Sequence, residues 1–150
     1  MTFTIRPVVE TDRNAWGSLY RGYRDFYKLE DDPEVLDRAW QWLMTGEHTL
    51  FGLVAAQEDE LLGLAHLKWM ARPSTGTICL YLDDLFTAPV ARGQGVGHAL
   101  LVRASQIAAE RGASVVRWIT DVDNTTARRV YDEVATATRW VTYDMAPKRG

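Results

Sequence analysis

The stretch RGQGVG, from Arg92 to Gly97, places three glycines at alternate positions directly before a run with helical periodicity. Glycine loses more backbone freedom on folding than any other residue, so three glycines this close together indicate that bare backbone is needed there. The first amides of a helix have no intrahelical partners, and the helix dipole adds positive potential at that end. Without side chains in the way, a diphosphate reaches these amides directly. The stretch therefore predicts an anion-binding loop at the start of a helix.

Two common phosphate-binding loops have other spacings. A Walker A loop ends in Gly-Lys-Ser/Thr, whereas Gly97 is followed by His98, which excludes that loop. A dinucleotide fingerprint needs Gly-x-Gly-x-x-Gly/Ala straight off a strand, but here the glycine spacing differs and Pro89 and Arg92 intervene. The dinucleotide alternative stays open because Asp121 ends the next expected strand, as a ribose-binding acid would. A plain glycine-rich turn before a core helix stays open as well.

Periodicity and turn signals predict a single domain over residues 1–150. The expected order is a strand, two helices, three antiparallel strands, a helix, a strand, a helix and a last strand. A strand, a helix and a further strand in succession place those two strands parallel. The fold class is therefore mixed α/β, with a mostly antiparallel sheet and helices on both faces. The expected elements cover, in order, residues 3–8, 11–28, 32–46, 49–57, 61–71, 75–89, 96–111, 114–120, 124–135 and 138–146.

Composition and charge limit the classes of partner that we expect this protein to bind. The net charge is −3 at pH 7, so no basic surplus favours nucleic acid as a partner. No apolar run approaches the length of a membrane span, and the N-terminus lacks the apolar region of a signal peptide, so we expect a cytoplasmic protein without a membrane partner. Cys79 is the single cysteine and is expected to be a buried structural thiol. His48, His66 and His98 show no metal spacing, so no metal is expected. His66 could line a substrate pocket, but a hydrogen-bonded core histidine is the preferred interpretation.

Two longer blocks resemble the GNAT superfamily of N-acetyltransferases. RGQGVG matches its Arg/Gln-x-x-Gly-x-Gly/Ala loop, and YLDDLFTAPVARGQGVGHALL resembles the surrounding strand, loop and helix, particularly in polyamine-type acetyltransferases. WITDVDNTTARRVYDEVA resembles the second block, Asn-x-x-Ala-x-x-x-Tyr, here Asn124, Ala127 and Tyr131. YRGYRDFY resembles the substrate region of small diamine and amino-acid N-acetyltransferases. The resemblance spans nearly the entire chain and implies an acetyl-CoA-dependent N-acetyltransferase whose two parallel strands splay apart.

The resemblance also implies where acetyl-CoA binds. Backbone amides around the end of the long strand would hold the acetyl carbonyl and the pantetheine, and the glycine loop would hold the pyrophosphate. Asn124 could bind CoA, cap its helix, or do both. The implied cofactor-binding residues are Leu85, Phe86, Thr87, Arg92, Gly93, Gln94, Gly95, Val96, Gly97, His98, Asn124 and Ala127.

Acetyl transfer to an amine needs a base that removes the ammonium proton and an acid that protonates the leaving thiolate. In relatives with the LEDLF form a glutamate is the base, and its position here is Asp83; the motif tyrosine, the acid, is Tyr131. Asp83 is one methylene shorter than glutamate, so a bridging water is expected. Asp84 is the competing base and should lie on the opposite face if the strand alternates regularly. The candidates for acceptor binding are Tyr23, Tyr27, Tyr81 and Asp84.

We expect the acceptor to be a small primary amine, namely a diamine, a polyamine or an amino-acid-like compound. Two adjacent carboxylates at the expected cleft favour a cationic molecule. Many relatives carry Gly-Phe where this chain has VATATRW, which leaves the acceptor end of the pocket less defined. Acetylation of a protein N-terminus or lysine, and a non-catalytic acyl-CoA sensor, remain alternatives. A homodimer is a further expectation.

Overall fold

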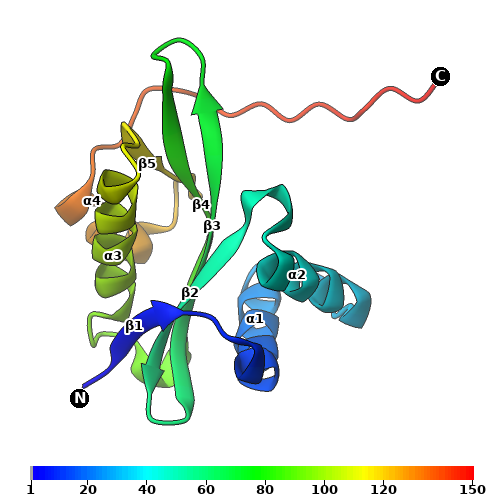
Figure 1. The fold of residues 1–150 in the computed structure, drawn as a ribbon, viewed down its shortest axis with the longest axis vertical. Helices are drawn as coiled ribbons and strands as arrows, with labels where there is room; N and C mark the ends of the chain where they lie inside the picture. Colours follow the sequence, from blue (N-terminus) through cyan, green and yellow to red (C-terminus); the bar gives the residue numbers. More distant parts are fainter. Residues whose placement is uncertain (1) are drawn as a thin grey trace.

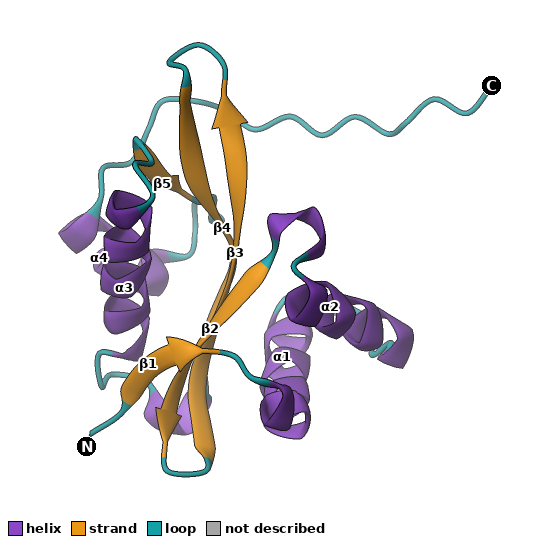
Figure 2. Ribbon diagram, in the orientation of Figure 1, coloured by secondary structure: helices purple, strands orange, loops and turns teal. Residues whose placement is uncertain are grey.

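A twisted five-stranded sheet runs through the middle of the molecule (Figures 1 and 2) in a computed structural model that describes residues 2–150. The spatial order of the strands equals their order in the chain, with antiparallel neighbours from β1 to β4 and a parallel pair β4–β5. This confirms the predicted mixed, mostly antiparallel sheet. The strands are β1 (Thr4–Pro7), β2 (Phe51–Gln57), β3 (Glu60–Arg72), β4 (Thr77–Thr87) and β5 (Val115–Arg117).

Helices cover both faces of the sheet, as predicted (Figure 2). One face carries α1 (Arg13–Phe26) and α2 (Pro33–Thr45), and the other carries α3 (Val96–Glu110) and α4 (Thr125–Val134). Three residues mark the two ends of α2. The side chain of Asp32 accepts a hydrogen bond from the Glu34 amide, Pro33 lies in the first turn, and Gly46 ends the helix. Short 3-10 turns span Glu10–Asp12, Glu47–Thr49 and Pro89–Ala91.

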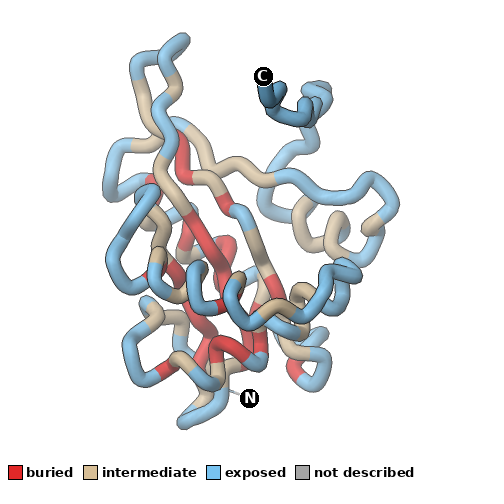
Figure 3. The backbone as a smooth tube through the Cα atoms, turned by 90° about the vertical axis from the view of Figure 1, so that its right-hand side faces the viewer, coloured by how far each residue is buried: buried red, intermediate tan, exposed pale blue. Residues whose placement is uncertain are grey.

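Alternation along the strands builds two cores. Leu53 and Ala55 of β2 belong to the core under α3, whereas Val54 between them belongs to the core under α1 and α2. The buried parts of the chain follow the central strands, between the two helical layers (Figure 3). Within residues 2–150, no helix is both long and apolar enough to cross a membrane.

Two strand predictions differ from the structure. The strand expected over residues 114–120 pairs only through Val115–Arg117, because the chain leaves β4 after that point and Ile119 is 63% exposed. The last strand, expected over residues 138–146, is wrong. This segment leads away from the sheet without pairing (Figure 1), and its Trp140 and Tyr143 are exposed. Alternating apolar residues make a strand only where a neighbouring strand accepts their backbone hydrogen bonds.

Candidate active site

The two parallel strands separate in the middle of the sheet. Their pairing runs from Cys79 with Val115 to Tyr81 with Arg117 and then ends, while β4 continues to Thr87. This confirms the predicted splay. A small cavity of about 40 Å³ lies at the separation. It is lined by Tyr23 and Tyr27 at the end of α1, by Leu82, Asp83 and Leu85 of β4, by Trp118, Ile119 and Thr120 after β5, and by Tyr131 of α4.

A β-bulge places Asp83 beside this cavity. Leu82 pairs with Leu67, but Asp84 pairs with His66, so Asp83 is an extra residue in β4 with no partner on β3. Asp83 accepts a hydrogen bond of 3.1 Å from the ammonium group of Lys68. Asp84 contacts His66 instead, with 2.8 Å between its Oδ2 and the imidazole Nδ1.

The bulge also corrects one expectation about the two carboxylates. His66 and Lys68 lie two positions apart on β3 and therefore point to the same face of the sheet. Because Asp83 contacts Lys68 and Asp84 contacts His66, both carboxylates lie on the face that α1 covers. The expectation of opposite faces is wrong, because it assumed an unbroken strand.

Asp84 is the more buried carboxylate, at 16% side-chain exposure against 31% for Asp83. Burial opposes its ionisation, but hydrogen bonds from His66 and from the nearby tyrosine hydroxyls outweigh burial and hold its pKa below the usual range. Tyr20 donates one of these bonds at 2.9 Å. Asp84 does not line the cavity, whereas Asp83 does. Of the two candidate bases, Asp83 is therefore the one that lines this cavity.

Tyr131 reaches the cavity from α4. Its ring packs edge-on against Trp118, with the ring centres 5.3 Å apart. Burial, with a smaller contribution from nearby Tyr27, raises the pKa of Tyr131 to about 12. A phenol with this pKa keeps its proton at neutral pH, so its hydroxyl is available as a proton donor.

The three tyrosines expected to bind the acceptor divide into two groups. Tyr23 and Tyr27 line the cavity, and their ring centres lie 4.8 Å apart. Tyr81 does not line it, and lies instead beneath Lys68, whose ammonium nitrogen is 5.3 Å from the ring centre. The structure thus places Asp83, Tyr23, Tyr27 and Tyr131 around one cavity, whereas Tyr81 and Asp84 are not among the residues that line it.

The glycine loop directly precedes α3 and is shaped as an open cradle. Gly93 and Gly95 have φ values of 81° and 84°, a region that side chains rarely adopt. A Cβ atom added at either glycine would meet nothing within 4 Å. Gly95 is the N-cap of α3, and the Ala99 amide makes the bond to its carbonyl, so the amides of the first turn point into this open space. This open helix start leaves room for an anion such as a diphosphate.

The other predicted cofactor residues differ in what their side chains can do. Leu85 lines the cavity, while Phe86 and Val96 are core side chains, 8% and 1% exposed, so only their backbones are available to a ligand. Arg92 donates from Nε to the carbonyl of Thr87 at 3.2 Å, which leaves its terminal nitrogens for an anion. Gln94 bonds to the carbonyl of Val90 at 3.3 Å, and Gly97 and His98 lie in the first turn of α3, where His98 is exposed.

Asn124 caps α4, and its side chain accepts a 3.4 Å bond from the amide of Ala127. Capping accounts for both residues, and a contact with CoA stays a prediction. Within the described residues, no three His, Cys, Asp or Glu side chains cluster as metal ligands would.

Comparison with known proteins places this geometry in a family. A sequence model of the acetyltransferase (GNAT) family matches residues 16–135, which is most of the chain. The chain belongs to the acetyltransferase (GNAT) family. The protein is therefore an acyltransferase enzyme with the N-acetyltransferase fold.

Relatives and solved structures agree with this GNAT assignment. The chain is 28% identical to the D-amino-acid N-acetyltransferase HPA3 of Saccharomyces cerevisiae, over 93% of this chain and 88% of that protein. It is 25% identical to the thialysine N-epsilon-acetyltransferase of Sus scrofa, over 75% of this chain and 71% of that protein. In fold it is similar to a crystal structure of a probable acetyltransferase, with a TM-score of 0.86 and 24% identity over 98% of this chain and 99% of that one.

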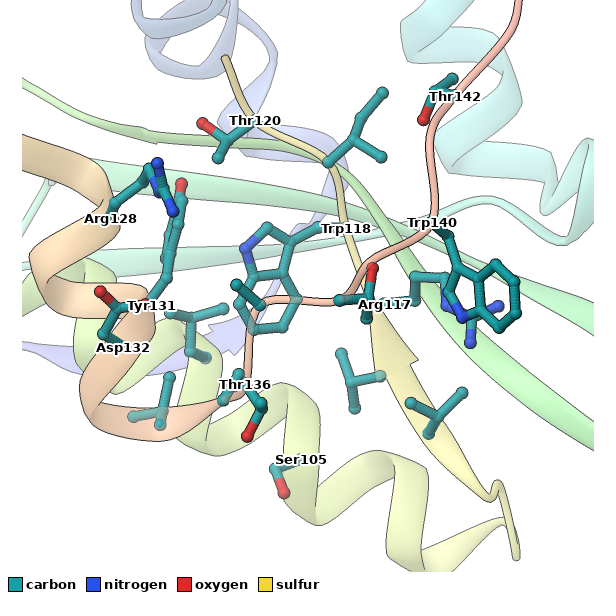
Figure 4. A pocket seen from close by; sticks show the side chains of 18 of the residues that line it. Ser105, Arg117, Trp118, Thr120, Arg128, Tyr131, Asp132, Thr136, Trp140 and Thr142 are labelled. Carbon is teal, nitrogen blue, oxygen red and sulfur yellow. The ribbon is translucent and has the colours of Figure 1, made fainter. Parts of the chain in front are cut away.

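Tyr131 also lines a second and larger cavity of about 1200 Å³ in this GNAT domain (Figure 4). It is bounded by α3, β5, α4 and residues 135–142, and Trp118 and Tyr131 line both cavities. Its walls are apolar at Leu101, Val116 and Val134. β5, which contributes to its lining, is the edge strand of the sheet in residues 2–150, where the predicted last strand does not form.

Sequence reasoning missed three features of the GNAT site, at Trp16, Lys68 and Trp118. The hydrogen-bond partner that holds His66 is Trp16, whose side chain belongs to the buried face of α1 and reads as ordinary core. The contact between Lys68 and Asp83 was also missed, although a lysine on the neighbouring antiparallel strand is a signal that pairing could have used. Trp118 gave no signal beyond its place in an apolar strand.

Proposed function

We propose that this enzyme transfers an acetyl group from acetyl-CoA to a primary amine of a small cationic molecule, with Asp83 as general base and Tyr131 as general acid. The observation that carries the proposal is that Asp83 and Tyr131 line one cavity at the separation of the parallel strands. The relatives named as acetylating D-amino acids and thialysine are in accord with a small amine acceptor.

Acetyl-CoA, as donor substrate, supplies an activated acyl group on a thioester sulfur. The amides at the start of α3 and the guanidinium of Arg92 would hold its diphosphate. The part of β4 from Leu82 to Thr87 that lacks a β5 partner would offer backbone groups to the rest of the donor.

Asp83 would take the proton that the acceptor ammonium must lose before its lone pair can attack the acyl carbon. The carboxylate of aspartate is short, so one water would bridge it to the amine. As the new C–N bond forms, the C–S bond breaks, and the hydroxyl of Tyr131 would give its proton to the departing sulfur. After the attack the new nitrogen carries a positive charge and loses a second proton, which restores the hydroxyl of Tyr131, while the proton held by Asp83 passes to solvent, so the enzyme ends unchanged.

CoA release in the presence of acetyl-CoA tests this function across diamines, polyamines, D- and L-amino acids, aminoglycosides and peptides. The proposal expects the highest kcat/KM with a small primary amine that carries a positive charge. Preference for a long neutral peptide over every small amine would overturn the acceptor class. Tight acetyl-CoA binding without turnover on any acceptor would favour an acyl-CoA sensor.

A further inference from the structure

We propose that Trp16 holds His66 in its neutral form, so that Asp84 keeps an unneutralised negative charge behind the cavity and turns it into a subsite for a cationic amine. Trp16 and His66 are in this view positioning residues that act through Asp84. The inference rests on the proposed amine acceptor and explains how the fold would select it.

The direction of one hydrogen bond decides the form of His66. The indole N–H of Trp16 lies 2.9 Å from Nε2 of His66, and an indole nitrogen can only donate. Nε2 must therefore carry a lone pair, and the single ring proton of His66 sits on Nδ1. That proton is donated to Oδ2 of Asp84 across 2.8 Å. Trp16 is 1% exposed and His66 is 3% exposed, so water does not replace either partner.

The charge on Asp84 follows from this tautomer. At 2.8 Å the contact between His66 and Asp84 has the geometry of a salt bridge, but protonating Nε2 would set two N–H groups against each other at the Trp16 contact. The contact is then a hydrogen bond from a neutral ring to a carboxylate. The other hydrogen bonds to Asp84 come from the hydroxyls of Tyr20 and Tyr23, which are also uncharged. Asp83, by contrast, is paired with a cation, Lys68.

Around Asp84, the cations Lys68 and Arg24 are equal in number to the carboxylates Asp83 and Asp121, so they do not cancel the charge of Asp84. Arg24 of α1 lies near Tyr20 and donates to the carbonyl of Glu30, and Arg13 lies over the Trp16 ring but pairs with Asp37. Asp121 adds a negative charge near Tyr27. The titratable and charged groups that face His66 and Asp84 are thus Tyr20, Tyr23, Arg24 and Tyr27 from the α1 region, Lys68 from β3 and Asp83 from β4.

The charge of Asp84 reaches the cavity through the tyrosines that line it. Burial raises the pKa of Tyr23 and of Tyr27, and the negative charge of Asp84 raises each of them further. Both rings line the cavity beside Asp83. A cation in the cavity would therefore interact with Asp83 directly and with Asp84 at a short distance, across tyrosine hydroxyls and ring faces that also favour cations.

Imidazole nitrogen NMR of the wild-type enzyme tests the first step without any acceptor. His66 is the buried histidine, while His48 and His98 are exposed. The expected result is a neutral Nδ1–H tautomer for His66 near neutral pH, as the Trp16 hydrogen bond requires. A His66 ring that is doubly protonated near neutral pH would overturn the proposal.

Trp16→Phe tests the second step, with binding of 1,4-diaminobutane measured by calorimetry. This probe stays doubly charged over the whole pH range used. In Trp16→Phe the Nε2 atom is free to take a proton, so affinity should fall about tenfold between pH 8 and about pH 5.5, while wild-type affinity stays constant. The double variant Trp16→Phe/His66→Asn has no ring to protonate and should lose this pH dependence.

Trp40→Phe is the matched control, because Trp40 packs on Trp16 with ring centres 5.0 Å apart, whereas the hydrogen bond to His66 comes from Trp16. It shortens an aromatic side chain in the same cluster and should leave diamine affinity independent of pH. Parallel pH profiles for Trp16→Phe and wild type would overturn the proposal.

The measurements separate this inference from the proposed function. Diamine binding with the expected pH behaviour but without acetyl transfer to any amine would support the charged subsite and refute the proposed function. Acetyl transfer to uncharged acceptors, with no diamine binding at any pH, would overturn the subsite and leave acetyl transfer standing.

Discussion

Asp83 and Tyr131 line one cavity, although a bulge in β4 supplies the first and the helix α4 supplies the second. Asp83 thus supplies a carboxylate to the cavity, and Tyr131 supplies a protonated phenol. Each has a variant that changes its chemistry with little change of shape.

Asp83→Asn should lower kcat/KM for an amine acceptor by about 10²-fold or more at neutral pH, because the base is lost. The loss should shrink toward alkaline pH, where more of the acceptor is already the free amine. Initial rates from about pH 6 to 10 check this. Asp121→Asn, which removes an exposed nearby carboxylate, is the control and should keep the wild-type profile. An unaltered pH profile in Asp83→Asn would refute the base assignment.

Tyr131→Phe should lower kcat by about 10²-fold, with little change in acetyl-CoA affinity, because only the proton donor is removed. Since the pKa of Tyr131 is raised to about 12, the hydroxyl stays protonated at neutral pH and loses its proton only as the pH approaches that value. The wild-type rate should therefore show no loss of the acid up to about pH 10. Tyr143→Phe makes the same substitution at an exposed residue and should have no effect. A normal kcat in Tyr131→Phe would assign the ring to packing.

Gly95→Val should abolish the rise in melting temperature that acetyl-CoA gives to the wild-type enzyme. Valine would place its side chain in the open space above the first turn of α3, where the diphosphate is expected. Valine is also strained at the φ of 84°, so the variant melts earlier without ligand.

Gly76→Val separates the strain from the ligand effect. Gly76 has a φ of 64° and open space around it, but lies in the turn between β3 and β4, away from the cradle. This variant should melt earlier and still respond to acetyl-CoA. A ligand response in Gly95→Val equal to that of Gly76→Val would contradict the cradle.

Asp12→Asn should lower the free energy of unfolding by about 1–2 kcal/mol near neutral pH, because Asp12 accepts two hydrogen bonds from the guanidinium of Arg6. These bonds lower the pKa of Asp12 in the folded state, and burial opposes them only in part. A lowered folded-state pKa stabilises the protein above the unfolded-state value and loses this effect as the pH falls through the folded-state value.

The difference between Asp12→Asn and wild type should therefore be full above about pH 5 and should shrink below about pH 4. Urea unfolding at several pH values checks it. Asp37→Asn removes the exposed partner of Arg13 and should change stability by less than about 0.5 kcal/mol. Equal effects of the two variants would mean that the Arg6 contact adds nothing beyond a surface pair.

Local signals sufficed for most of the fold. Residues close together in the chain predict the caps of α2 and the acidic turn between β2 and β3. They also predict that β4 and β5 run parallel. The glycine loop could likewise be recognised, because positive φ values and an open helix start demand particular residue types.

The remaining features depend on contacts that no local pattern reveals. The bulge at Asp83 arises from the pairing of β3 with β4, and the sequence of one strand alone does not predict this pairing. Trp16 and His66 are far apart in sequence, and nothing in either segment shows that their nitrogens meet. The segment 138–146 shows the opposite failure, because its apolar alternation is typical of a strand but no neighbour pairs with it.

The extra residue in β4 makes the site depend on a count of residues as well as on their identity. A strand presents its side chains alternately, so one added residue exchanges the faces of everything that follows it. Downstream of Asp83, Phe86 packs against Gly22 of α1, and Leu85 lies on the side of α3. Deleting one residue between Leu82 and Leu85 would turn Phe86 toward the wrong helical layer and displace the chain that leads into the glycine cradle. This stretch of β4 therefore tolerates exchange of its side chains better than any change in its length.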